Sequence, residues 1–124
     1  MSQTTTYDVL IPQGGTLFQQ GGDFTTIAAS GAVPSGGPGT FVITDTGVAA
    51  LTLAAPVPTS QDGDKITIFS TTAHAHTLTA TGLLQTGSAS VNEATFAAHP
   101  GAGLTLLAYQ GYWVVQYAIG ITFS

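Results

Sequence analysis

Three histidines are the residues of this chain best suited to chemistry. His74 and His76 stand two apart in the stretch TTAHAHTLTATG, and on a strand this spacing puts both imidazoles on one face. With His99 as third ligand they would suffice for a catalytic zinc site. Only Thr, Ala and Leu surround the pair, so no carboxylate is at hand to orient the rings. We prefer the interpretation of packed strand histidines, with no metal and no cofactor, and retain as an alternative a ring of one histidine per chain around a symmetry axis.

The acidic residues do not form a recognisable catalytic set. The triplet Asp-Thr-Gly at residues 45–47 matches one loop of an aspartic protease, but a second loop and flaps are missing, so a turn is favoured. Asp62–Asp64 lacks the regular ligand spacing of a calcium loop and is also typical of a turn. Glu93 is the only glutamate, and no G-x-S-x-G elbow is present. We therefore expect no catalytic residues and no enzyme.

The charge composition excludes several classes of partner. Lys65 is the only cation, six acidic residues give a net charge of −5, and charged residues make up 6% of the chain. One lysine cannot build a surface for nucleic acid or for an anionic membrane. No apolar run reaches the length of a membrane span, and the first residues do not resemble a secretion signal, which indicates synthesis in a cytoplasm without export. Low charge with a mean hydropathy of +0.35 predicts self-association or docking on another surface.

Short runs of Thr, Val, Ile and aromatic residues, separated by Gly, Pro and Asp, predict an all-β fold. We expect one domain over residues 1–124, a β-sandwich or jelly roll of short antiparallel strands. Its Gly/Pro-rich residues 1–38 are either an extended arm or surface loops, and residues 39–124 are the folded body. The predicted strands are Tyr7–Ile11, Phe24–Ala28, Gly39–Thr44, Ala49–Leu53, Lys65–Ser70, His74–Ala80, Glu93–Ala98, Leu104–Tyr109 and Tyr112–Ile119, with Ile121–Phe123 extending the last.

The C-terminal part carries the clearest local signals. Gln110–Gly111 lies between two apolar runs, which predicts a two-residue hairpin loop. Alternate residues after it form an apolar set that predicts one core face, namely Trp113, Val115, Tyr117, Ile119, Ile121 and Phe123. The other face, with Tyr112, Val114 and Gln116, is either core or a subunit contact.

Residues 62–117 as a whole resemble a known group of proteins. The stretches DGDKITIFSTTAHAHTLTATG and ATFAAHPGAGLTLLAYQGYWVV are similar to small structural proteins of tailed bacteriophages, and within that group to the capsid decoration, or cement, proteins. The resemblance implies an all-β homotrimer in the virion, on the outer capsid surface, that stabilises the head by bridging copies of the major capsid protein. A tail-fibre or baseplate receptor-binding module, with Tyr109, Tyr112 and Tyr117 against a glycan, is the alternative.

Two sets of contact residues follow as expectations from this reading. The expected capsid contacts are apolar residues near the N-terminus: Tyr7, Val9, Ile11, Leu17, Phe18 and Phe24. The expected subunit interface is His74, His76, Tyr112 and Val114.

Overall fold

The computed structural model describes residues 24–124, and this part of the chain is all-β, as the sequence predicts. Over the same residues no helix is long and apolar enough to cross a membrane. The strands are β2 (Thr25–Ile27), β3 (Gly31–Ala32), β4 (Gly39–Ile43), β5 (Ala50–Thr52), β6 (Lys65–Ser70), β7 (Thr77–Gln85), β8 (Ser90–Phe96), β9 (Gly103–Tyr109), β10 (Tyr112–Ile119) and β11 (Ile121–Phe123).

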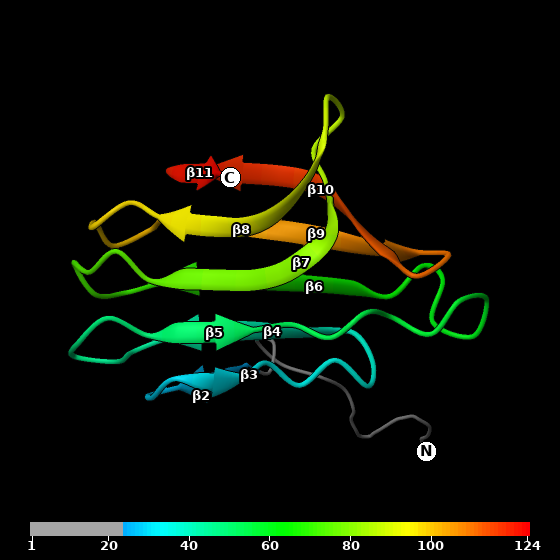
Figure 1. Cartoon of the computed structure of the whole chain (residues 1–124). Helices are drawn as coiled ribbons and strands as arrows, with labels where there is room; N and C mark the ends of the chain where they lie inside the picture. The colour runs from blue at the N-terminus through cyan, green and yellow to red at the C-terminus, as the bar shows by residue number, and fades with distance from the viewer. Residues whose placement is uncertain (1–23) are drawn as a thin grey trace, which may run out of the picture.

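The strands belong to one mixed sheet that curls into two layers. Figure 1 shows β5, β7 and β8 in front of β4, β6 and β9. The long strand β7 joins the layers, because its first residues pair with β5 and β8 while Leu84 and Gln85 pair with β10. Its pairing with β8 is irregular between Thr79 and Leu84, and Gly82 there has a φ of 70°, a conformation that favours glycine. This bend lets one strand serve both layers.

The first six strands described alternate between the layers, so that the chain passes from one layer to the other after each strand. β2, β4 and β6 pair in parallel in the rear layer, and β3, β5 and β7 pair in parallel in the front layer. Of the nine pairings among the described strands, five are parallel and four antiparallel. The expectation of an antiparallel fold is therefore wrong for the first half and correct for the strands that follow, except where β10 pairs in parallel with the end of β7.

The predicted strand positions are mostly confirmed. β6 and β10 have the predicted bounds, whereas the strand expected to begin at His74 begins at Thr77, because residues 71–76 form a hydrogen-bonded loop. Within residues 1–38, predicted to be an extended arm or surface loops, the described part contains β3, and Val33 after it is buried. The predicted strand Tyr7–Ile11 lies outside the described residues.

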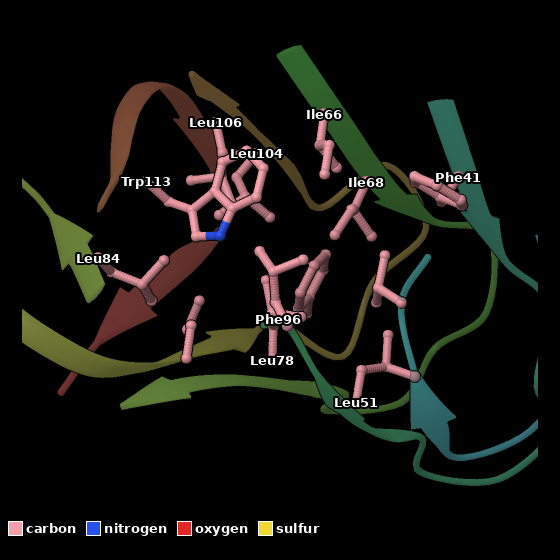
Figure 2. Close-up of a cluster of buried hydrophobic side chains, with 14 of the residues drawn as sticks. Phe41, Leu51, Ile66, Ile68, Leu78, Leu84, Phe96, Leu104, Leu106 and Trp113 are labelled. Atoms are coloured by element: carbon pink, nitrogen blue, oxygen red, sulfur yellow. The ribbon is translucent and has the colours of Figure 1, made fainter. Parts of the chain in front are cut away.

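The core lies between the two layers (Figure 2) and is made of alternate residues from both. Trp113, predicted to be core, is fully buried, and its indole Nε1 donates to the carbonyl of Ala54 at 2.9 Å. Leu104 and Leu106 of β9 lie above Phe96 in Figure 2. Burial of each large apolar side chain contributes about 1.5–3 kcal/mol, so this core is the main source of stability.

The C-terminal hairpin is confirmed, but the single apolar face predicted after it is not. Gln110 and Gly111 have φ values of 47° and 85°, and Tyr109 pairs with Tyr112 across the two-residue loop. Further along β10 the register shifts between Val115 and Tyr117, which marks a β-bulge.

The bulge reverses which side chains of β10 point to the core. Trp113 and Val115 contact the core, whereas Tyr117 is 59% exposed and Ile119 is 50% exposed. The separate strand β11, which pairs with β8, returns its own apolar residues to the core. The predicted core face is therefore wrong for Tyr117 and Ile119, because one extra residue breaks the period of two.

Candidate functional site

His76 is the most buried ionisable side chain described, with none of its surface exposed. Its Nδ1 accepts a hydrogen bond from the backbone N–H of Ala49 at 2.9 Å, and its Nε2 lies 2.8 Å from Oγ1 of Thr72. The ring packs edge-on against Phe96, with 6.5 Å between ring centroids. Because Nδ1 is an acceptor, the proton of the neutral ring is on Nε2, which donates to Thr72.

This arrangement assigns His76 a structural role. A histidine that activates a hydroxyl needs a free lone pair facing it, but here Nε2 presents its proton to Thr72. Burial lowers the pKa of His76, and the neighbouring His74 lowers this pKa further, while Asp45 opposes the shift. The ring is therefore held neutral and ties the loop before β7 to the loop before β5.

The loop at residues 71–76 is fixed by short-range bonds that the sequence encodes. Ser70 is buried, and its Oγ donates to the carbonyl of Thr72 at 2.9 Å. The backbone N–H and the hydroxyl of Thr71 both donate to the carbonyl of Ile43, each at 3.0 Å. Ser and Thr side chains compete with the strand ladder in this way, which explains why β7 starts after the histidine pair.

The three histidines do not gather into a metal site. The rings of His74 and His76 lie 6.0 Å apart between centroids, but neither residue belongs to a strand, so the predicted shared strand face is not formed. His99 is exposed in the loop before β9. Within residues 24–124, no three His, Asp or Glu side chains lie close enough together to hold a metal ion.

Two acidic motifs prove to be turns. Oδ1 of Asp45 accepts the N–H of Gly47 at 3.0 Å, between β4 and β5. Oδ1 of Asp62 accepts the backbone N–H of Gln110 at 2.8 Å and that of Thr59 at 3.1 Å. The bond from the Gln110 backbone is the main cause of the lowered pKa of Asp62. Asp62 therefore fastens the loop before β6 to the β9–β10 hairpin.

The residues expected to contact a capsid or another subunit fall in different places. Of the N-terminal set only Phe24 is described; it is 62% exposed and packs edge-on against Phe69. Tyr7, Val9, Ile11, Leu17 and Phe18 lie outside the described residues. In the expected interface set, His74 is half-buried, Tyr112 is 45% exposed and Val114 is partly exposed. His76 cannot contact another subunit through its side chain, because that side chain is enclosed by its own chain.

A surface that the sequence pattern missed lies on the rear layer. We call it the outer face, the side of β6, β9 and β10 that points away from the core. A groove of about 150 Å³ crosses it. The sequence does not reveal this surface, because Tyr117 and Ile119 continue the alternation of apolar residues that begins at Trp113 and so appear to be core residues. The bulge turns these two side chains outward. The outer face consists of Phe24, Thr67, Phe69, Gly103, Thr105, Tyr117 and Ile119.

No model of a known protein family matches this chain, and no curated protein matches it in sequence.

Proposed function

We propose that the protein is a structural component of a tailed-bacteriophage particle that decorates the outer surface of the head and bridges copies of the major capsid protein. The observation that carries the proposal is the outer face. Of the seven large apolar side chains that are exposed in the described part, Phe24, Tyr117 and Ile119 belong to the outer face. Two more, Tyr109 and Tyr112, lie on the β9–β10 hairpin next to it. A monomer with so much apolar surface is suited to assembly.

Decoration requires binding and no catalysis. This is consistent with the geometry of His76, whose two ring nitrogens are both used in hydrogen bonds within the fold. A protein that binds the assembled shell and not its free subunits stabilises the shell by its own binding free energy. The ordered, neutral His76 fits a rigid framework for such binding. As part of this proposal, the two layers act as a β-sandwich whose enclosed core supports the binding surface.

Immunogold labelling of particles from the source, with antibody raised against the whole chain, tests the proposal. We expect gold over the head, with pre-immune serum as the control. Gold confined to the tail would favour the receptor-binding alternative. Unlabelled particles, in a preparation where the antibody detects the protein in infected cells, would contradict both assignments.

The receptor-binding alternative has one observation in its favour. A second groove, of about 440 Å³, lies beside the β7–β8 hairpin and is lined by neutral hydrogen-bonding groups that include Gln85, Thr86, Ser88 and Ser90. Such groups suit the hydroxyls of a glycan. If this is the function, the purified chain should adsorb to host cells, and Thr86→Ala with Ser88→Ala should weaken adsorption without changing the melting temperature.

A further inference from the structure

The outer face is built of two rows of side chains that cross three strands. In the register of the rear layer, Phe69 pairs with Gly103 and Gly103 with Ile119. In the next row, Thr67 pairs with Thr105 and Thr105 with Tyr117. The alternate residues of β6 and β9, among them Ile68 and Leu104, point into the core in Figure 2, so these rows point away from it.

Gly103 opens the groove in the first row. It has no side chain to fill the space between Phe69 and Ile119, and all three line the groove. A Cβ at Gly103 would lie 2.8 Å from the carbonyl oxygen of Ile68, so the strands approach too closely there for any other residue. The notch is therefore a fixed feature of the packing.

Tyr117 supplies a projection beside this notch. Its ring is 59% exposed at the rim of the groove, where the bulge turns it outward. A projecting aromatic residue next to an apolar notch is self-complementary, since the projection of one copy can enter the notch of another.

The charges favour a second copy of the chain as the occupant. The chain carries a net charge of −5, so identical copies repel each other wherever their acids meet. Lys65, the only cation of the chain, lies at the start of β6 on the outward side, because Ile66 and Ile68 point into the core. In the part of the chain that the structure describes, the acids do not line the groove: Asp45 is in the β4–β5 loop, Asp62 and Asp64 precede β6, and Glu93 is on the front layer. Copies that meet through the outer face keep these charges apart.

The polar groups of the outer face also tolerate burial. The hydroxyls of Thr67 and Thr105 bond to each other at 3.1 Å across the strands. One hydroxyl donates to the other, so covering this pair costs less than burying two hydroxyls without partners.

We propose that the outer face binds the outer face of a second copy, with Tyr117 of one copy seated in the Gly103 groove of the next. The contact closes as a two-fold pair or as the three-fold ring that the resemblance to capsid decoration proteins implies. Tyr112 and Val114, expected at a subunit interface, lie on the same side of β10 and extend the contact. The inference deepens the proposed function by naming the chain's own copies as a partner, and its test needs no virion.

Sedimentation equilibrium of the full chain, from about 1 μM to about 100 μM, measures the association. We expect a dimer or trimer, and at least about a tenfold weaker association for Tyr117→Glu or Ile119→Glu, since each substitution puts like charges into the centre of the contact. Val57→Glu is the matched control, because Val57 is 55% exposed and does not line the groove. Circular dichroism and the melting temperature verify that every variant is folded.

The outcomes separate this inference from the proposed function. A wild-type chain that stays monomeric over the whole range overturns self-association. Equal weakening by Val57→Glu and by the two outer-face variants also overturns it, because net charge alone would then be responsible. A third outcome is a chain that is monomeric in solution but is found on phage heads by immunogold labelling. If Tyr117→Glu abolishes this labelling of the heads, the outer face binds the shell protein instead, and the decoration proposal stands.

Discussion

His76 shows how one buried side chain makes stability depend on pH. In the unfolded chain its pKa is near the ordinary value of 6.5, and in the fold this pKa is lowered. Between the two pKa values the unfolded state binds more protons, so the free energy of unfolding rises with pH. We expect the stability contributed by the neutral ring to be complete above about pH 6.5 and to be lost as the pH falls below it, at no more than about 1.4 kcal/mol per pH unit.

Urea unfolding between pH 7.5 and pH 5 measures this slope. His76→Gln should flatten the pH dependence, even if it lowers stability at every pH, since Gln does not titrate. His99→Gln is the matched control and should keep the slope, because His99 is exposed. An unchanged slope in His76→Gln would show that another group carries the pH dependence.

Gly103 is the residue at which the close approach of strands has a measurable cost. We expect Gly103→Ala to lower the free energy of unfolding by about 1–3 kcal/mol, because its Cβ would lie 2.8 Å both from the Ile68 carbonyl oxygen and from Cβ of Phe69. Gly36→Ala is the control: nothing lies within 4 Å of its Cβ, so it should be neutral or slightly stabilising. Chemical denaturation compares the two variants, and equal stability of both would contradict the close approach.

At the scale of elements, local sequence patterns predicted the positions of strands and turns better than they predicted which strands pair. Lys65–Ser70 and the hairpin at Gln110–Gly111 were predictable because alternation and turn chemistry are encoded within a few residues. The parallel pairs of β2 with β4 and of β3 with β5 were not, since partner choice depends on where the chain returns after a loop. The Gln116 bulge was hidden too, because it depends on the facing strand β9.

The same limit applies to the candidate site. The spacing of His74 and His76 predicted a shared strand face, but both residues precede β7. The hydrogen-bond partners of His76 are Ala49 and Thr72, and Ala49 is distant in sequence. The absence of regular strand structure at residues 71–76 comes from Ser and Thr hydroxyls that bond to nearby backbone groups. The alternation of apolar and polar residues, from which the strand was predicted, gives no sign of these bonds.

The loop before β6 and the β9–β10 hairpin are joined by one carboxylate. Asp62→Ala removes the acceptor for the backbone N–H groups of Gln110 and Thr59, so we expect a lower unfolding midpoint and faster amide exchange at Gln110. Asp64→Ala is the control, since the hydrogen bond of Asp64 to β9 uses its backbone carbonyl. The stabilisation by Asp62 should vanish as the pH falls below 3.8 toward the lowered pKa, because the native state then loses the charged acceptor. Identical exchange at Gln110 in both variants would contradict this role.

At the scale of the whole molecule, the question is whether the parallel strands and the antiparallel strands unfold together. Stacked strands can unfold independently when each contacts only its neighbours. Here Leu51 of the parallel half and Trp113 of the antiparallel half belong to one core cluster, and β7 pairs with strands of both halves. These contacts couple the two halves.

Leu51→Ala tests this coupling with the only tryptophan as the probe. A cavity at Leu51 costs about 2–5 kcal/mol, and if the core is one cooperative unit Trp113 fluorescence should report that whole loss in urea unfolding. Far-ultraviolet circular dichroism, which follows all strands, should give the same midpoint. Val57→Ala, at an exposed position, should change stability by less than about 0.5 kcal/mol. If the fluorescence midpoint stayed at the wild-type value while the dichroism midpoint fell, the parallel strands would be unfolding separately from the antiparallel ones.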